Sequence, residues 1–275
     1  MIEILFAILI GWTFDRAQMM ISASNYSTVF NGFGAIDLTV KKQIKAPMAY
    51  RVLVPFLVSW IEQTFKVDAK YRVFIYQNLK AFFVILAAYS VIHVFGIVTA
   101  LITFLILLLT IQFDYWDWPI ELAAVVFASG GHFVPALLLG ILFAFSRETA
   151  PITGFIYWIA SGDIAGGIII SGFTVLLMLG VRIFVGKREL YCKRVMWKDN
   201  LILFKNFLKW KPFAYSPLFV TSAITAGSLI SVIVNPQYWY SLIFIIAGWV
   251  LAKADEPRVF SAVVPFISLM IGGSL

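Results

Sequence analysis

The stretch VTALITFLILLLTI, residues 98–111, decides the fold class, because it carries no charge and is apolar on every side. The whole chain of 275 residues is 61% hydrophobic and 13% charged, with a mean hydropathy of +0.93. Soluble domains are about half apolar and about a quarter charged, so a water-soluble core of this size could not bury so much apolar surface. The composition therefore predicts a chain that lies in a lipid bilayer.

The apolar segments are expected to be helices, because backbone N–H and C=O groups in lipid must be satisfied within the segment. A transmembrane β-barrel would show short segments of alternating polarity, and residues 98–111 do not alternate. The sequence thus predicts an all-α, polytopic transmembrane helix bundle with about 9 to 11 membrane segments, some short or re-entrant. The apolar segments cover residues 2–13, 48–64, 73–95, 96–112, 119–129, 131–146, 151–161, 164–185, 213–234, 236–252 and 259–275.

A single integral membrane domain is expected over residues 1–275, since no polar domain separates the apolar segments. An extracytoplasmic first loop would occupy roughly residues 15–47. The N-terminal segment lacks a basic region and a small-residue cleavage site, so we interpret it as a retained first helix.

The net charge of +7 comes from basic residues that lie between apolar segments and concentrate from Arg182 to Lys211. This distribution is typical of cytoplasmic loops and argues against nucleic acid as a partner. The segment at roughly residues 186–211 is also amphipathic, and it is either an interfacial helix attracted to anionic lipid headgroups or a plain linker. Its apolar positions are Trp197, Leu201, Phe204 and Leu208, and its basic positions are Lys198, Lys205 and Lys209.

The side of the membrane on which Arg147 and Glu148 lie depends on how many segments cross. The basic loops near residues 66–72 and 187–211 are both predicted to be cytoplasmic, so an even number of crossings separates them. If every intervening segment crosses, Arg147 and Glu148 face the cytoplasm. If residues 119–146 form one broken helix and the next segment is re-entrant, they face outward.

Ionisable side chains within or beside spanning helices are costly unless they are paired or hydrated, so each one is a candidate functional residue. Lys80, in an otherwise apolar segment, is expected to extend its amine to the interface, with pairing to an acid as the alternative. The other candidates form four groups: Asp15, Arg16 and Asp37; Tyr50 and Arg51 in AYRVLVP (49–55); Asp114 and Asp117 in FDYWDWP (113–119) with Arg147 and Glu148 in SRETAPI (146–152); and Asp255, Glu256 and Arg258 in ADEPRVF (254–260).

Taken in order, these motifs resemble bacterial polytopic membrane proteins related to the GT-C glycosyltransferase superfamily. The resemblance implies a GT-C-like fold in the bacterial inner membrane and a polyprenyl-phosphate sugar donor. It also implies a catalytic acidic residue in the first extracytoplasmic loop, either Asp37 or Asp15. The substrate-binding residues would be Tyr50, Arg51, Arg147, Glu148, Asp255, Glu256 and Arg258.

The residue types suit this chemistry. Inverting sugar transfer needs a carboxylate that accepts the proton of the attacking hydroxyl, and cations that stabilise the departing phosphate. The planar guanidinium of Arg51 suits phosphate. Cofactors stay open: either none is used, or Asp114 and Asp117 hold a divalent cation through oxygen ligands.

Two other classes of function remain open. A transporter or channel would use buried charges and short, glycine-interrupted segments as a substrate path. A non-catalytic subunit would bind other membrane proteins and act only with them. Motifs of soluble enzymes, such as a Walker A loop or HExxH, do not occur in the sequence. The two histidines, His93 and His132, lie too far apart in sequence for a metal-binding motif.

Overall fold

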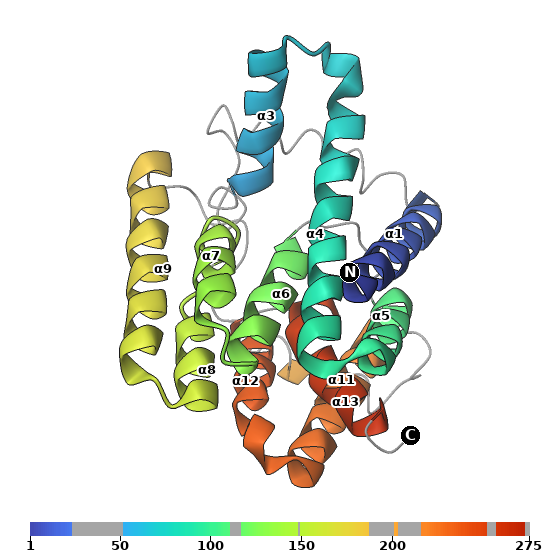
Figure 1. The fold of residues 1–275 in the computed structure, drawn as a ribbon, viewed down its shortest axis with the longest axis vertical. Helices are drawn as coiled ribbons and strands as arrows, with labels where there is room; N and C mark the ends of the chain where they lie inside the picture. Colours follow the sequence, from blue (N-terminus) through green and yellow to red (C-terminus); the bar gives the residue numbers. More distant parts are fainter. Residues whose placement is uncertain are drawn as a thin grey trace. The chain divides into compact units, whose positions relative to one another are not determined.

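The computed structural model describes residues 1–23, 52–110, 117–147, 149–186, 201–202, 216–251 and 257–272, and every regular element within them is a helix (Figure 1). The all-α prediction is confirmed for this part of the chain. The elements are α1 (Ile2–Ala23), α3 (Leu53–Phe65), η2 (Ala69–Tyr71), α4 (Arg72–Phe95), α5 (Ile97–Thr110), α6 (Asp117–Ser129), α7 (Phe133–Ala144), α8 (Ile152–Ser161), α9 (Ile164–Val185), α11 (Ser216–Val234), η4 (Pro236–Ser241), α12 (Leu242–Leu251), η5 (Pro257–Val263) and α13 (Val264–Gly272).

The helices form two compact units. The first contains residues 1–90 and 113–192, and the second contains residues 91–112 and 193–275. In the first unit, α6 packs against α7 and α8, and α8 and α7 pack against α9. In the second, α13 packs against α5 and α11. The candidate site described below lies entirely within the first unit.

Helix α6 is unusual because every residue from Asp117 to Ala128 is buried. It ends at Gly130 and Gly131, and the positive φ of +72° at Gly131 is a conformation that residues with a Cβ rarely adopt. The chain can therefore turn sharply and start α7 at Phe133. A polar side chain on α6 has no face on which to reach solvent, so its partners must come from neighbouring elements.

Helices α8 and α9 approach closely through small residues. A Cβ atom at Gly167 would lie 2.8 Å from the carbonyl oxygen of Gly154 and 2.6 Å from Cβ of Trp158. The Ser171 hydroxyl donates a hydrogen bond to the Pro151 carbonyl oxygen at 2.9 Å. Such small-residue contacts with an interhelical hydrogen bond are typical of helix packing in lipid.

The second unit has an aromatic core. Phe95 and Tyr238 both make ring contacts with Phe266 of α13, at centroid distances of 5.7 and 5.2 Å. Gly248 of α12 lies directly against the ring of Phe260. The last two apolar segments of the sequence each begin with a 3-10 helix, η4 and η5, before continuing as α12 and α13.

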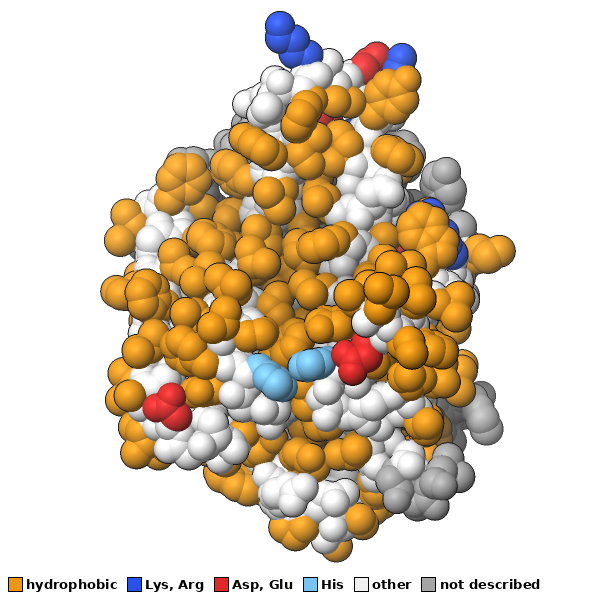
Figure 2. All heavy atoms as spheres, in the orientation of Figure 1, with side chains coloured by type: hydrophobic (Ala, Val, Ile, Leu, Met, Phe, Trp, Pro, Cys, Tyr) orange, Lys and Arg blue, Asp and Glu red, His pale blue; other side chains and the backbone are white. Residues whose placement is uncertain are grey.

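Two of the described helices, α4 and α9, are long and apolar enough to cross a membrane. Shorter apolar helices of 10–17 residues make up much of the rest. In Figure 2, hydrophobic side chains cover most of the face in view, and charged side chains are few on it. The expected number of membrane segments stays a prediction.

The first helix differs from its predicted bounds. The apolar segment was expected to end at residue 13, but α1 continues to Ala23. The predicted start of the first loop at residue 15 is therefore wrong, and Asp15 and Arg16 both lie inside a helix. The helix continues through these charges because Asp15 has a cationic partner on a neighbouring helix.

Candidate functional site

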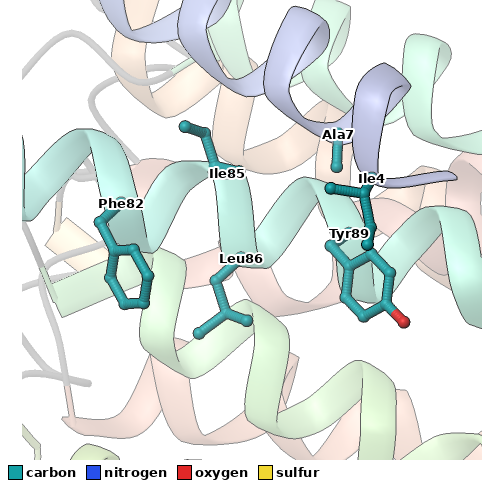
Figure 3. Close-up of a pocket in the computed structure, with 6 residues that line it drawn as sticks. All are labelled: Ile4, Ala7, Phe82, Ile85, Leu86 and Tyr89. Atoms are coloured by element: carbon teal, nitrogen blue, oxygen red, sulfur yellow. The ribbon is translucent and has the colours of Figure 1, made fainter. Parts of the chain in front are cut away.

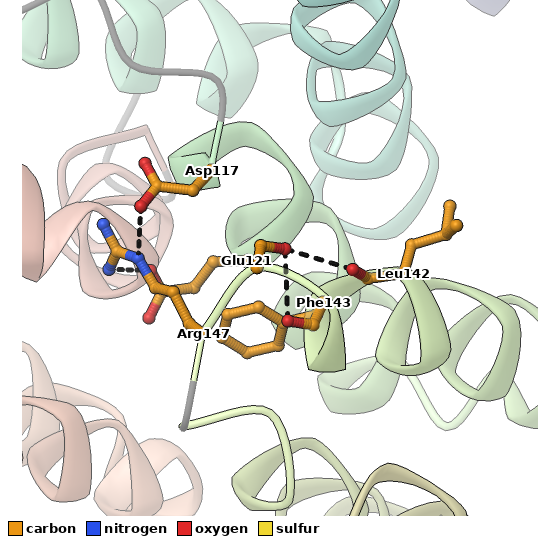
Figure 4. A network of polar contacts seen from close by, with 6 residues as sticks. Asp117, Glu121, Leu142, Phe143 and Arg147 are labelled. Carbon is orange, nitrogen blue, oxygen red and sulfur yellow. Dashed lines mark hydrogen bonds and ion pairs between the residues drawn. The ribbon is translucent and has the colours of Figure 1, made fainter. Parts of the chain in front are cut away.

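Three charged side chains form a buried cluster where α6 begins and α7 ends (Figure 4). Arg147 donates a hydrogen bond from Nε to Asp117 Oδ2 at 2.9 Å, and another from Nη1 to Glu121 Oε2. Asp117 and Glu121 stand one helical turn apart on α6, so both carboxylates face the same side of the helix. The exposed fraction is 8% for the Arg147 side chain and 2% for each acid.

The end of α7 fixes the direction of Arg147. Its backbone N–H donates to the Phe143 carbonyl oxygen at 2.8 Å. The Ser146 hydroxyl lies 3.1 Å from the carbonyl oxygens of both Leu142 and Phe143 and satisfies the end of the helix. Phe143 itself is fully buried. The backbone that carries the guanidinium is thus held at the helix terminus and is not part of a free loop.

The cluster joins two segments that are 30 residues apart in sequence. Removing charges from water is expensive, and it is offset only where the charges are hydrogen-bonded to one another in good geometry. Two nitrogen atoms of Arg147 face carboxylates, which makes these contacts charge-assisted and directional. The described contacts therefore fit a residue that positions its surroundings. The structure brings Asp117 into contact with Arg147, two residues that the sequence placed in one candidate group.

A second motif meets the same end of α7. The backbone N–H groups of Val52 and Leu53 donate to the carbonyl oxygen of Phe145, at 2.9 and 3.3 Å. Val52 is buried and packs with Val181 and Val185 of α9. Val52 and Leu53 belong to AYRVLVP, and Phe145 is the residue before SRETAPI. The start of α3 and the end of α7 are therefore hydrogen-bonded to each other.

The FDYWDWP motif also contacts the first helix. Trp118 is fully buried, and its ring packs edge-on against Phe14 of α1 at a centroid distance of 5.5 Å. Since Trp118 follows Asp117 directly, the packing of its large ring helps to hold the start of α6 in place. Contacts of three motifs, AYRVLVP, FDYWDWP and SRETAPI, thus converge within the first unit.

A second buried ion pair connects α1 and α4. Lys80 Nζ lies 2.8 Å from Asp15 Oδ1, and both side chains are fully buried. The helices approach closely here, since a Cβ atom at Gly11 would lie 2.7 Å from Cα of Ile85. The prediction that Lys80 extends to the interface is wrong, because the carboxylate of Asp15 offers it a partner inside. Asp15 is enclosed by this pairing, which leaves Asp37 as the candidate catalytic carboxylate.

A shallow apolar depression of about 240 Å³ lies along the same two helices (Figure 3). Ile4 and Ala7 of α1 form one side of it, and Phe82, Ile85, Leu86 and Tyr89 of α4 form the other. Apart from Tyr89, the residues that line it have aliphatic or phenyl side chains, so the depression offers an apolar surface.

Most of the other predicted site residues lie outside the described part of the chain. Arg258 lies in η5, and its side chain is not described. No group of three or more His, Cys, Asp or Glu that could hold a metal ion occurs among the described residues. Asp117, one of the two metal candidates, pairs with Arg147. The predicted residues outside the described part are Asp37, Tyr50, Arg51, Asp114, Glu148, Asp255 and Glu256.

Sequence reasoning missed Glu121. It is an acid inside the apolar run PIELAAVVFA, four residues after Asp117, and both features were visible in the sequence. An acid at this spacing shares a helix face with Asp117, and an acid within an apolar helix requires a partner. These two signals together would have identified it.

Comparison with known proteins gives no relative. No protein-family model matches the chain, and no curated protein or solved structure matches it either. The function proposed below therefore depends on the residues of this chain and on how they are arranged.

Proposed function

We propose that the chain is an integral membrane protein, placed in a bacterial inner membrane, whose exposed apolar side chains face lipid. On α9, Ile168, Leu176 and Ile183 are 67%, 67% and 82% exposed, while the charged cluster around Arg147 is buried. A protein folded in water would favour the opposite arrangement, with charges outside. Lipid accepts exposed apolar side chains and requires charges to be paired inside.

Extraction of membranes tests this location. Membranes from cells that express the full chain are washed with alkaline carbonate, and the protein is followed in the pellet and the supernatant. An integral protein stays in the pellet and is released only by detergent. Release by carbonate alone would contradict the proposal.

Within that membrane we propose a GT-C-like glycosyltransferase that takes its sugar from a polyprenyl-phosphate donor and transfers it to a lipid, glycan or protein acceptor. The observation that supports this most is the convergence of three motifs. Val52 contacts Phe145 through the backbone, and Arg147 contacts Asp117 through the side chain. Residues distant in sequence would thus contribute to one catalytic site at this end of the first unit.

The residue roles follow from the chemistry of sugar transfer. Asp37 accepts the proton of the acceptor hydroxyl as its oxygen attacks the anomeric carbon. The bond from that carbon to the phosphate oxygen breaks, and polyprenyl phosphate leaves with the bonding electrons. Arg51, assisted by Tyr50, stabilises the negative charge that develops on the phosphate.

The buried cluster has a positioning role in this scheme. Arg51 directly precedes Val52, whose backbone is bonded to Phe145 two residues before Arg147. A shift of Arg147 would therefore move the end of α7 and with it the start of α3. Even a displacement of about 1 Å at a site of this kind is enough to lower a rate substantially.

Donor turnover in proteoliposomes tests the transferase. The probe is a polyprenyl-phosphate-linked, radiolabelled hexose, water serves as the acceptor, and the products followed are polyprenyl phosphate and free labelled hexose. Asp37→Asn is expected to lower turnover by at least about a hundredfold, the range for loss of a general base. Asp68→Asn is the matched control, because Asp68 is an exposed carboxylate in the α3–α4 connection and pairs only with Lys70 among the described residues. Wild-type turnover in Asp37→Asn would contradict the assignment.

A transporter is the second candidate, and the short helices favour it. Helices α6, α7 and α8 have 13, 12 and 10 residues, whereas a bilayer core needs about 20. Gly131, at positive φ, lies between α6 and α7, and Gly162, also at positive φ, ends α8. Broken helices beside buried charges are typical of transporters.

Proton flux separates the two candidates. Vesicles that contain the chain and an internal pH-sensitive dye are given a pH gradient without any sugar donor. A transporter that uses the cluster for protons would show flux that Glu121→Gln lowers. A transferase would show the flux of empty vesicles and turn over donor instead.

A further inference from the structure

The connection between α3 and α4 exposes aromatic and basic side chains together. Trp60 and Phe65 near the end of α3 are 58% and 67% exposed, and Tyr71 and Phe74 near the start of α4 are 50% and 68% exposed. In Figure 2, which has the orientation of Figure 1, charged side chains gather at the end of this hairpin and hydrophobic side chains lie directly beneath them. We call this surface the α3–α4 tip: Trp60, Phe65, Lys66, Lys70, Tyr71 and Phe74.

The turn that carries the two lysines is held by hydrogen bonds. The backbone N–H groups of Lys66 and Val67 both donate to the Glu62 carbonyl oxygen, the second at 3.0 Å. The Glu62 carboxylate accepts two hydrogen bonds from the Arg72 guanidinium, at 2.7 and 2.9 Å, which join the end of α3 to the start of α4. The lysines of the tip therefore extend from a hydrogen-bonded turn.

Lys66 has a backbone conformation that favours glycine. Its φ of +50° and ψ of +39° lie in the left-handed region, and it is the only non-glycine residue with a positive φ among the residues that the structure describes. Helices commonly end with glycine in this conformation, because glycine has no Cβ that crowds the backbone. A lysine at this position carries a conformational cost, which a contact between its side chain and a ligand would offset.

The two lysines of the tip differ in their partners. Lys70 Nζ lies 3.2 Å from Asp68 Oδ2 and 5.1 Å from the centroid of the Tyr71 ring. Lys66 is also exposed, and no described residue forms an ion pair with it. Its ammonium group is therefore available to an anion from outside the chain.

The position of the tip at the start of α4 indicates which anion this is. Helix α4 is one of the two described helices that are long and apolar enough to cross a membrane, and its 24 residues extend over about 36 Å. Since the hydrocarbon layer is about 30 Å thick, the start of such a helix lies at the boundary with the lipid headgroups. The tip extends over about 9 Å of α3, from Trp60 to Lys66, and one headgroup layer is about 5–8 Å thick.

We propose that the α3–α4 tip binds the phosphate of an anionic lipid headgroup through Lys66, with the aromatic rings of the tip in the same headgroup layer. Trp and Tyr are enriched in this layer because their rings are apolar and their N–H and O–H groups are polar. The loop at residues 66–72 is predicted to be cytoplasmic, and the cytoplasmic leaflet carries the anionic lipids. The inference depends on the proposed membrane location, and it does not depend on the transferase activity.

Quenching of a dye at the tip tests this contact. Thr64, an exposed residue in the last turn of α3, is replaced by cysteine in a Cys192→Ser background and labelled with bimane. The full chain is reconstituted in phosphatidylcholine vesicles that contain a small fraction of spin-labelled phosphatidylglycerol or spin-labelled phosphatidylcholine, with the label near the top of the acyl chain. Phosphatidylglycerol is expected to bind beside the dye about fivefold more strongly, the scale of one lysine at an anionic membrane surface.

Variants of the chain decide whether Lys66 is responsible. Lys66→Gly is expected to abolish the preference for phosphatidylglycerol while the chain folds at least as stably, because glycine adopts a positive φ without cost. Lys66→Arg should keep the preference, and Asp68→Asn should increase it by releasing Lys70. Arg182→Gln is the matched control, because it removes the same charge from the last turn of α9 and leaves the tip unchanged. Equal quenching by the two lipids, or a preference that survives in Lys66→Gly, would overturn the proposal.

Two further measurements distinguish a lipid headgroup from other surroundings of the tip. Strong quenching by aqueous iodide with none by either lipid would place the tip in water, where an acidic protein could bind it, and the headgroup proposal would fail. Vesicle flotation of each variant is measured in parallel. A chain that floats but shows no lipid preference contradicts this inference alone, whereas a chain that does not float contradicts the membrane location itself.

Discussion

Among the described residues of the first unit, two buried charge groups differ in both composition and place. The Asp15–Lys80 pair lies within the lengths of α1 and α4, and its described contact joins one carboxylate to one ammonium group. The cluster around Arg147 lies at helix ends and matches two carboxylates with one guanidinium. A one-to-one pair between two long helices is sufficient to join them. A cluster at helix ends, beside the AYRVLVP motif, lies where its side chains can contribute to a functional site.

Loss of Arg147 is expected to have the largest effect on stability. Arg147→Met would leave the carboxylates of Asp117 and Glu121 buried one turn apart without their guanidinium. Removing one member of a buried ionic group costs about 3–5 kcal/mol, and the upper end is expected because two acids lose a partner. The free energy of unfolding in mixed detergent micelles measures it. Arg147→Met combined with Asp117→Asn and Glu121→Gln should recover most of the stability but not the donor turnover.

Loss of Lys80 is expected to rank second. Lys80→Met leaves one buried carboxylate. The free energy of unfolding should therefore fall by an amount near the lower end of the same range, about 3 kcal/mol. The double variant Asp15→Asn with Lys80→Met is expected to recover stability and also to keep donor turnover. That recovery would show that the Asp15–Lys80 pair has a structural role, in contrast to the functional role of the cluster around Arg147. Loss of turnover in a stably folded double variant would show that the two groups do not differ in role.

A smaller effect is expected where α1 and α4 touch. Gly11→Ala places a methyl group against the backbone of Ile85, and overpacking of this kind costs about 1–3 kcal/mol. Gly180→Ala on α9 is the control, because no heavy atom lies within 4 Å of its added Cβ. The same unfolding measurement compares the two. Equal stabilities would mean that α1 and α4 are not in close contact.

Much of the helical architecture could be predicted from apolar length alone. The segment expected at residues 164–185 is α9 with the same bounds, and the one expected at 73–95 is α4 shifted by one residue at its start. The ends of helices were harder to predict where charged residues lie next to the apolar segment. The expected end of the first helix at residue 13 failed because Asp15 is stabilised by Lys80, a partner 65 positions away that no local pattern reveals.

The candidate site was predictable in part. The grouping of Asp117 with Arg147 followed from the rule that charges in lipid require partners, and the structure brings them together. Glu121 was overlooked, although its spacing from Asp117 places it on the same helix face. The backbone contact between Val52 and Phe145 has no side-chain signature, so sequence alone could not reveal it.

The contact between the start of α3 and the end of α7 is the central claim, since it brings AYRVLVP and SRETAPI to one place. It is tested by Val52→Cys with Phe145→Cys in a Cys192→Ser background, in native membranes. A protease site is inserted at Val67 in the α3–α4 connection, and mild oxidation precedes cleavage. The two fragments should stay joined until reductant is added. As a control, Val52→Cys with Val134→Cys, at the opposite end of α7, should separate. Fragments that separate in both variants would contradict a single site built from these motifs.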